Sequence, residues 1–458
     1  MSRRPVPLIL VLCLTLVLVL LAGPTSPAPI SKAIGPLDDF VIAPEVLAND
    51  PAEFRQFRPD IVYPQVLDPD PTIQAMMSQV ISPTVVQYDG GLSGEWPVTI
   101  GGSAYTITTR HTYSGVPIQK ATQYVGEHMD NLGLDIEYHV WNASRPPNVI
   151  GQMNGETNPE DIYLIVAHID DMPSGGAAPG ADDNASGTTA VMIAADILSQ
   201  YRWDCTLRFV FFTGEEQGLL GSSAYAQRSY YAGENILGVL NLDMIAWNTA
   251  NSSPDIDLHA NQSIPATISL AQLFSDVVST YNLDLIPQII PSGTGASDHY
   301  PFWQYGYPSI LAIEDYYGAG DFNPYYHTVQ DTLDHTDIDY FTEFVRAAVG
   351  TFAHMNGCLV QGETGMLDGH VAAANTSAPI PSANITLDGP HSYQVTTDNN
   401  GYYTTTLPVG TYTMTIAAAG YLTTTFTNIT IITNTVTTQD AMLDPQFQTI
   451  YLPAVRRE

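Results

Sequence analysis

The sequence predicts an α/β domain followed by a small all-β domain, and two observations carry that prediction. Short, largely apolar runs at residues 161–167, 207–212 and 236–245 are typical of strands that are buried on both faces of a sheet. At residues 362–444, short runs rich in Thr, Val, Ile and Tyr are instead separated by turn signals, which is typical of a β-sandwich. The chain of 458 residues is long enough to hold both domains.

The N-terminal segment has the pattern of a secretory signal peptide. Residues 2–4 (SRR) precede an apolar run at residues 8–22 that is too short to span a bilayer comfortably. We therefore expect residues 1–22 to be a signal peptide and the protein to be secreted or extracellular; a membrane anchor formed by an uncleaved leader is the alternative. Residues 23–71 are rich in Pro, Asp and Ala without sustained periodicity, so we expect a linker or a propeptide-like segment.

The predicted α/β domain covers residues 72–357. Apolar residues recur at helical spacing in residues 187–201, between the first two predicted strands. Strand, loop, helix and strand then form a crossover unit, which joins parallel strands. A helix at residues 340–355, again with apolar residues at helical spacing, is expected to close the domain. A doubly wound α/β architecture follows from this order of elements.

Residues of the types that bind metals recur at or just past the ends of the predicted strands. They lie in five short segments, which are 167–170 (AHID), 179–184 (PGADDN), 213–216 (TGEE), 241–243 (NLD) and 326–328 (YHT). Each segment alone has an ordinary explanation, such as a turn, a helix start or a hydrogen-bonded histidine. Open α/β sheets, however, place their binding crevice at the carboxyl ends of the strands. Because two imidazoles and several carboxylates suit a pair of zinc ions, the five segments together predict a two-metal hydrolase site.

These segments, with 297–299 (SDH), resemble family twenty-eight of the metallopeptidases, the secreted di-zinc aminopeptidases, over roughly residues 75–357. The resemblance implies a mixed-sheet di-zinc exopeptidase domain flanked by helices, with two Zn²⁺ per catalytic domain. It implies that Asp183 bridges the two metals. His168 and Asp243 then complete one metal site, and Glu216 and His327 complete the other.

The resemblance also implies roles for residues that do not bind metal. Glu215 is expected to be the general base, because a carboxylate beside an activated water can take its proton and return it to the leaving amine. Asp170 fits a partner that orients the imidazole of His168. Tyr326 matches a position from which a phenol hydrogen-bonds the developing oxyanion, with packing or an exposed hydroxyl near the pocket as the alternative.

The segment around residues 297–299 differs in one position from the pattern of the family. Some relatives carry an arginine just before the Ser-Asp-His phrase and others a disulfide, whereas this chain has Ala296, so substrate specificity cannot be transferred. Consecutive residues rarely form a serine-hydrolase triad, and no Gly-x-Ser-x-Gly elbow occurs. We therefore expect residues 297–299 to form a wall of the pocket or to support the ligands.

The C-terminal domain has its own resemblance. The phrases 369–371 (GHV), 401–403 (GYY) and 407–412 (LPVGTY) resemble the carboxypeptidase regulatory-like domain, a transthyretin-like sandwich. We expect a stabilising or spacing module, with contact to a surface or polysaccharide as the alternative. Residues 445–458 form a short tail.

Charge and cysteine content restrict the partners and the cross-links. The net charge of -33, from 47 acidic and 14 basic residues, makes nucleic acid and anionic membrane surfaces poor partners. Cleavage of the leader would remove Cys13 and leave Cys205 and Cys358, which could form one disulfide, although the sequence does not decide their pairing.

The sequence as a whole predicts a secreted zinc-dependent aminopeptidase that acts on peptide or protein N-termini. A carboxypeptidase or dipeptidase would need cationic groups for a terminal carboxylate, and the five segments contain acids and no arginine. A glutaminyl cyclase on a related scaffold is a further alternative, which the five-ligand set disfavours. An inactive surface-binding protein is the alternative from another class. The preferred N-terminal residue, the native metal and the oligomeric state stay open.

Overall fold

The computed structural model describes residues 61, 63–64, 68–316, 321–360, 362, 364–389 and 392–446. The expected signal peptide, most of the expected linker and most of the expected tail lie outside the described residues. Within the described part of the chain, no helix is both long enough and apolar enough to cross a membrane.

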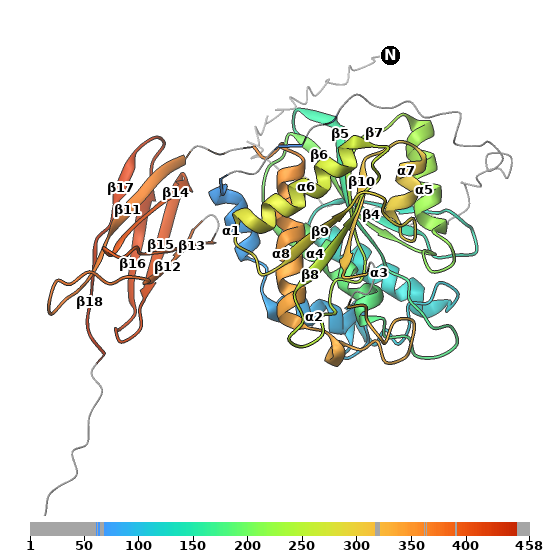
Figure 1. Ribbon diagram of the computed structural model, residues 1–458, viewed down its shortest axis with the longest axis horizontal. Helices are drawn as coiled ribbons and strands as arrows, with labels where there is room; N and C mark the ends of the chain where they lie inside the picture. The colour runs from blue at the N-terminus through green and yellow to red at the C-terminus, as the bar shows by residue number, and fades with distance from the viewer. Residues whose placement is uncertain are drawn as a thin grey trace, which may run out of the picture. The chain divides into compact units, whose positions relative to one another are not determined.

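One mixed sheet of eight strands forms the centre of the α/β domain (Figure 1). Its strands, in spatial order, are β3 (Asp135–His139), β4 (Asn148–Met153), β6 (Cys205–Phe212), β5 (Asn158–His168), β7 (Asn235–Leu242), β10 (Ser309–Glu314), β8 (Asp255–His259) and β9 (Ile286–Ile290). The four central strands β6, β5, β7 and β10 run parallel, so their carboxyl ends lie at one edge of the sheet. β5 lies between β6 and β7. The chain passes from β5 to β6 on one side and then crosses to β7 on the other side. Open sheets form their binding crevice at such a switch point.

Helices cover both faces of this sheet. They are α1 (Pro71–Ser78), α2 (Ser82–Leu92), α3 (Val116–Asn131), α4 (Gly187–Leu198), α5 (Leu220–Ala232), α6 (Pro265–Thr280), α7 (His299–Gln304) and α8 (Ile338–Met355). A short hairpin of β1 (Val98–Ile100) and β2 (Ser103–Tyr105) precedes α3. The expected helices at residues 187–201 and 340–355 are confirmed as α4 and α8.

The side chains of β5 alternate between two hydrophobic cores, as a strand with period two requires. Ile165 and Ala167 belong to the larger core, which includes Val191 of α4. Leu164 and Val166 belong to the core on the other face, which α5 and α7 supply with side chains such as Tyr225. Burial on both faces explains why these strands are almost continuously apolar in the sequence.

The strand expected at residues 236–245 is shorter in the structure, because β7 ends at Leu242. Met244 has a φ of 53°, which a strand does not accommodate. The chain therefore leaves the sheet at Asp243, and the apolar residues 244 and 245 are buried in the loop that follows.

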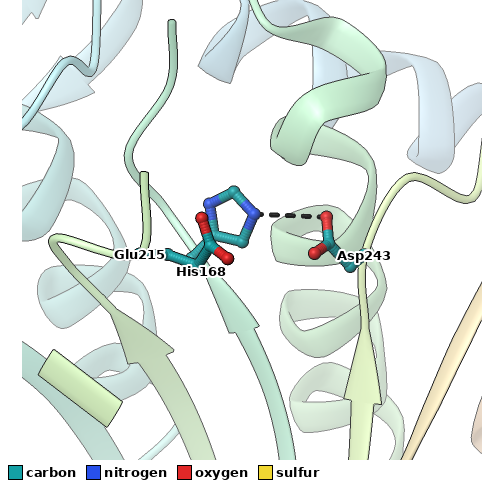
Figure 2. Close-up of side chains that lie close together, drawn as sticks. All are labelled: His168, Glu215 and Asp243. Atoms are coloured by element: carbon teal, nitrogen blue, oxygen red, sulfur yellow. Dashed lines mark hydrogen bonds and ion pairs between the residues drawn. The ribbon is translucent and has the colours of Figure 1, made fainter. Parts of the chain in front are cut away.

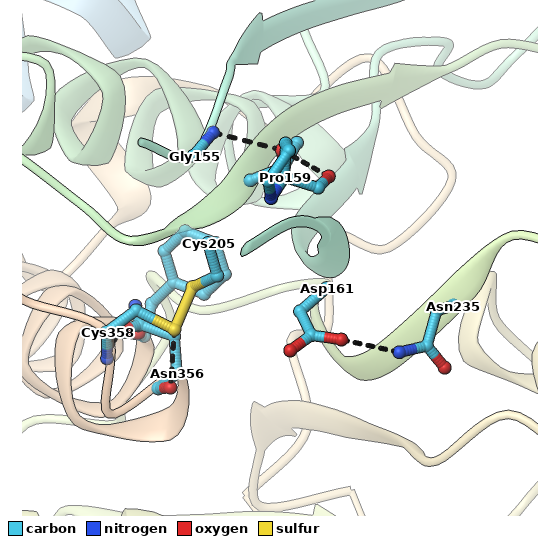
Figure 3. Close-up of a disulfide and its surroundings, with 9 residues drawn as sticks. Gly155, Pro159, Asp161, Cys205, Asn235, Asn356 and Cys358 are labelled. Atoms are coloured by element: carbon cyan, nitrogen blue, oxygen red, sulfur yellow. Dashed lines mark hydrogen bonds between the residues drawn. A yellow bond between two sulfur atoms is a disulfide. The ribbon is translucent and has the colours of Figure 1, made fainter. Parts of the chain in front are cut away.

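A disulfide joins the start of a central strand to the end of the domain (Figure 3). Cys205, the first residue of β6, is bonded to Cys358, which follows α8, and 153 positions separate them in the sequence. The backbone N–H of Asp204 donates to the carbonyl of Cys358 at 2.8 Å beside this bond. The pairing that the sequence left undecided is thus present.

The C-terminal domain is a sandwich of one mixed and one antiparallel sheet. One sheet has the order β14 (Tyr402–Pro408), β11 (Thr364–Ala373) and β17 (Val436–Thr438), and β18 (Ala441–Leu443) also pairs with β11. The other has the order β13 (Ser392–Thr396), β12 (Asn384–Asp388), β15 (Gly410–Ala417) and β16 (Thr424–Ile431). Alternate side chains of β15, such as Tyr412, Met414 and Ile416, fill the core between the sheets, which confirms the expected all-β fold.

Candidate active site

Residues predicted to bind metal gather at the carboxyl edge of the central strands. His168 is the last residue of β5, and Asp243 directly follows β7. Figure 2 shows the imidazole of His168 directed at Asp243, with the carboxylate of Glu215 beside it. Nε2 of His168 is 3.2 Å from Oδ1 of Asp243. Candidate ligand atoms of His168, Glu215 and Asp243 all lie within 4.8 Å of one another.

A second group of ligand atoms, from Asp183, Glu216 and His327, also lies within 4.8 Å. Oδ1 of Asp183 is 3.5 Å from Nε2 of His168, and Oδ2 of Asp183 is 3.2 Å from Nε2 of His327. Oε2 of Glu216 is 2.9 Å from that same nitrogen of His327. Asp183 therefore lies between His168 and His327. Asp243 lies beside the first of these histidines, and Glu216 lies beside the second.

The electrostatics of the site favour positive charge. Burial by itself would lower the pKa of His168, but the charges of Asp243 and the neighbouring carboxylates raise it well above its usual value. Burial also opposes the charged form of His327, but hydrogen bonds to Asp183 and Glu216 raise the pKa of His327 to about 10. Burial and the charge of Asp183 raise the pKa of Glu216 to about 8. In each case a bound proton relieves a surplus of buried negative charge, as a cation would.

These residues fit a pair of zinc ions by two observations. Two imidazole nitrogens and carboxylate oxygens are the donor types that zinc takes. Oε1 of Glu216 is buried and has no hydrogen-bond partner among the described residues. Because an unpaired buried carboxylate oxygen is costly, a divalent cation coordinated there would stabilise it.

Asp170 contacts both the imidazole of His168 and the backbone of residues 215 and 216. Nδ1 of His168 is 3.0 Å from the backbone oxygen of Asp170 and 3.8 Å from its carboxylate, so the backbone carbonyl orients the imidazole. The carboxylate of Asp170 instead accepts hydrogen bonds from the backbone N–H groups of Glu215 and Glu216, at 3.2 and 3.3 Å. It also accepts the hydroxyl of Thr112 at 2.7 Å. Asp170 therefore fixes the loop of the expected base through its carboxylate and the imidazole through its backbone carbonyl.

Ser297 lines the cavity and contacts Asp243, an expected metal ligand. Its hydroxyl donates to Oδ2 of Asp243 at 2.6 Å, and Nδ2 of Asn241 donates to the Ser297 oxygen at 2.7 Å. The sequence showed the motif that contains Asn241. It did not show the contact of Asn241 with Ser297, because that contact depends on the packing of β7 against the start of α7.

A small cavity of about 70 Å³ opens beside the two ligand groups. Its apolar wall includes Met244, Leu311 and Ile313, which form a buried cluster against Phe322. Tyr326 lines the same cavity, is 40% exposed and stacks on the imidazole of its neighbour, residue 327, at 3.6 Å between ring centres. The phenol of Tyr326 is therefore at the edge of the site, within the space that a substrate would enter.

Sequence reasoning missed Thr112, whose hydroxyl accepts from the backbone N–H of Gly214 at 3.1 Å and donates to Asp170. No local pattern marks a threonine far upstream of the motifs as their partner. Two histidines outside the motifs make structural contacts: His335 stacks on Tyr325, and His354 is 2.9 Å from the hydroxyl of Tyr281.

Known proteins with similar sequences are peptidases. A probable aminopeptidase of Saccharomyces cerevisiae is 28% identical over 236 residues, which are 48% of this chain and 60% of the yeast protein. A probable leucine aminopeptidase 1 of Trichophyton verrucosum is 31% identical over 204 residues, which are 42% of this chain and 53% of the fungal protein. The chain thus spans little more than half the length of these relatives.

Solved structures share the fold. An aminopeptidase of Legionella pneumophila superposes with a TM-score of 0.56 at 17% identity, and the match covers 66% of this chain and 78% of that one. Residues 148–351, which contain all five expected metal ligands, match the model of peptidase family M28. Residues 366–444 match the carboxypeptidase regulatory-like domain. The chain is therefore similar to peptidase family M28 over residues 148–351 and to the carboxypeptidase regulatory-like domain over residues 366–444.

Proposed function

We propose that the protein is a zinc-dependent aminopeptidase that removes residues from the N-termini of peptides. The observation that carries the proposal is the position of Asp183, whose two carboxylate oxygens face His168 and His327 in separate ligand groups. A carboxylate placed in this way suits a bridge between two metal ions. The aminopeptidase names of the similar yeast and fungal proteins support peptide substrates.

Bound zinc ions would lower the pKa of a water molecule and polarise the carbonyl of the scissile peptide bond. Burial, against the opposing charge of His168, raises the pKa of Glu215 well above its usual value, and the charges of Asp298 and Asp243 add to the rise. A carboxylate with a raised pKa holds a proton more readily. Glu215 therefore takes a proton from the attacking water and returns it to the leaving amine, while the hydroxyl of Tyr326 donates to the carbonyl oxygen as negative charge develops there.

The charges of the cavity favour an N-terminal amine over a C-terminal carboxylate. Asp183, Glu215, Glu216 and Asp243 line the cavity, and none of the described residues that line it is Lys or Arg. A carboxypeptidase or dipeptidase would need a lysine or arginine side chain for the terminal carboxylate, and the described lining offers neither. An ammonium group is attracted by the same acids.

Glu215 has a competing role, because its carboxylate lies among the ligand atoms of His168 and Asp243. Glu215→Gln separates the two roles, since an amide cannot act as a base. We expect Glu215→Gln to retain two zinc ions per chain and to lose activity by about 100-fold or more. Loss of one zinc ion in this variant would instead assign Glu215 to the ligands. Glu127→Gln is the matched control, because Glu127 caps Gly101 outside the site.

The experiment that tests the function compares free-amine, N-blocked and N-terminal glutaminyl peptides before and after chelation and zinc restoration. Zinc-dependent release of single N-terminal residues from free-amine peptides only is the expected result. Release of C-terminal residues from N-blocked peptides would indicate a carboxypeptidase, and ammonia release with ring closure would indicate a cyclase. A two-zinc protein that transforms none of these peptides would refute the proposal and favour a binding protein.

We further propose that the protein is exported, on the strength of the leader pattern at residues 1–22. A disulfide between Cys205 and Cys358 suits an oxidising compartment. N-terminal sequencing of protein from the culture medium would test this, because an uncleaved leader would instead anchor the protein to the cell. The sandwich at residues 366–444 is proposed as a stabilising module; retention of the full chain, but not of a sandwich-deleted chain, on polysaccharide would assign it a binding role.

A further inference from the structure

The loop at residues 179–183, which ends with the expected bridging carboxylate, is held by two buried charged side chains from distant parts of the sequence. Arg110 contacts the start of this loop, and Asp331 contacts its end. Neither side chain belongs to the two groups of ligand atoms. Loop 179–183 is therefore bound through its carbonyls by a cation and through its N–H groups by an anion.

Arg110 is fully buried, and its guanidinium donates to four backbone carbonyls. Within loop 179–183 it donates to the oxygens of Pro179 and Gly180, at 2.7 and 2.8 Å. It also donates at 2.8 Å to Ile169, the residue after the expected ligand at the end of β5, and at 2.8 Å to Leu92 at the end of α2. One rigid, planar group thus joins the loop at 179–183 to the strand end that carries His168.

Asp171 compensates the buried charge of Arg110. The two side chains are both fully buried and lie 3.5 Å apart, and Asp171 accepts the backbone N–H of Arg110 at 2.8 Å. Burial nevertheless raises the pKa of Asp171 to about 7, while Arg110 opposes the rise. The ion pair lets the guanidinium remain in the interior, where its hydrogen bonds to carbonyls are strong.

Asp331 holds the other end of the loop. Its Oδ1 accepts the N–H of Asp182 at 3.1 Å, and its Oδ2 accepts the N–H of Asp183 at 2.9 Å. Its backbone oxygen accepts the N–H of Ala181 at 3.0 Å. Asp331 is 2% exposed and follows His327 by only four positions, so it ties together two of the three segments that carry the second group of ligands.

Gly180 is the residue that lets both contacts form. Its φ is 47°, a region that side chains rarely adopt. A Cβ at this position would lie 2.3 Å from the carbonyl oxygen of Asp183 and 2.8 Å from the guanidinium of Arg110. Glycine is thus required at residue 180 because the backbone passes close to Arg110, and not only because the chain turns there.

We propose that Arg110 and Asp331 are positioning residues that hold loop 179–183 so that the two oxygens of Asp183 point to separate metal ions. This inference rests on the proposed two-metal function. Because each oxygen of Asp183 must face a different histidine, a small rotation of its backbone would misdirect both oxygens together. Substitution of Arg110 or Asp331 should therefore weaken the binding of both metal ions rather than of one.

Two conservative variants test the proposal in the full chain. Asp331→Asn keeps the shape but replaces one acceptor oxygen with an N–H₂ group that faces an N–H of the loop. Arg110→Lys keeps the charge but loses the planar set of donors. The matched controls lie away from the site: Asp70→Asn at the N-cap of α1, whose carboxylate accepts two backbone N–H groups, and Arg208→Lys, which pairs with Glu234.

Metal-free protein of each variant is titrated with Zn²⁺ against a chelator and, separately, with Co²⁺, whose visible absorption reports coordination geometry. We expect Asp331→Asn and Arg110→Lys to weaken the affinity for both ions by about 10- to 100-fold and to change the Co²⁺ spectrum. The controls should match the wild type. Peptidase activity and zinc stoichiometry of the wild type test the proposed function separately.

A structural role alone would lower the thermal midpoint of the metal-free protein and leave metal affinity and spectrum unchanged, and that result would overturn the inference. If Arg110→Lys fails to fold, Asp331→Asn decides the matter, since its side chain has the same volume. Weakening of only one of the two ions would also overturn it, because a shared bridge cannot be displaced for one ion alone.

Discussion

The apolar wall of the cavity leads to a quantitative prediction about the N-terminal residue of the substrate. Met244, Leu311 and Ile313 are at most 5% exposed and form an apolar part of the lining of the cavity. A leucine side chain has three more carbons than alanine, and burial stabilises by about 0.8 kcal/mol per carbon, so full burial gives about 2.4 kcal/mol and a ratio of about 60 in kcat/KM. A cavity of about 70 Å³ is too small to favour a tryptophan further.

The assay is kcat/KM for Gly, Ala, Leu, Trp and Glu as N-terminal residues of one peptide series. We expect leucine to exceed alanine by about 10- to 60-fold and glutamate to be the poorest, because its carboxylate would lose water against the apolar wall. Equal rates for Gly, Ala and Leu, or a preference for Glu, would refute the reasoning.

A variant of the wall connects this preference to the structure. Ile313→Ala removes part of the apolar wall, so the ratio of leucine to alanine should fall severalfold. The control is Ile286→Ala, because Ile286 is 43% exposed on β9 and does not line the cavity. The assay temperature must lie below the thermal midpoint of Ile313→Ala, since truncation of a buried isoleucine costs about 2–5 kcal/mol. An unchanged ratio in the folded variant would contradict the assigned wall.

Three further predictions concern catalysis and stability. Tyr326→Phe should lower kcat by about 10- to 100-fold with little change in KM, if its hydroxyl donates to the oxyanion; an unchanged kcat would leave it a packing role. Replacement of Cys205 and Cys358 by serine should lower the free energy of unfolding, measured in urea, by up to about 5 kcal/mol in the chain-entropy model for a separation of 153 residues, and a loss below about 1 kcal/mol would contradict that origin. Burial lowers the pKa of His139 from 6.5 to about 3, so its contribution to stability is complete above pH 6.5 and is lost as the pH falls toward 3. His139→Gln should therefore lose less stability than the wild type between pH 7 and pH 4 in acid denaturation monitored by circular dichroism, and equal losses would refute this.

The parts of the fold that could be predicted are those whose pattern is local. β5, β6 and β7 were visible as apolar runs because both of their faces are buried, and α8 was visible because one of its faces packs on the sheet. The edge strands β3 and β9 carry exposed and half-buried residues and gave no comparable signal. Each pairs along one side only, β3 with β4 and β9 with β8, so one of its edges is left without a neighbouring strand.

The ligand types could be predicted for a related reason. Parallel strands end at one edge, so motifs at successive strand ends must converge there whatever the details of the loops. The hydrogen bonds among them could not be predicted. Thr112, Arg110 and Asp331 act on the motifs from segments with no periodic or compositional signal, and Asp170 contacts the loop of residues 215 and 216 because that loop folds back over β5.

The places where local expectations fail are the places where the proposed chemistry lies. Met244 and His327 have φ values of 53° and 58°, which cost energy for residues with side chains. β7 ends early before Met244, so that the adjacent residue Asp243 can face the ligand group. The loop turns sharply at His327, so that His327 itself can face the ligand group. Such backbone persists only where other contacts determine it. At Met244 they are the hydrogen bond from its N–H to Oδ1 of Asn184 at 3.4 Å and the one that its carbonyl accepts from the N–H of Glu314 at 2.9 Å. A chain selected for stability alone would keep neither the strained backbone nor the buried carboxylates, and both are accounted for if the site exists to hold cations.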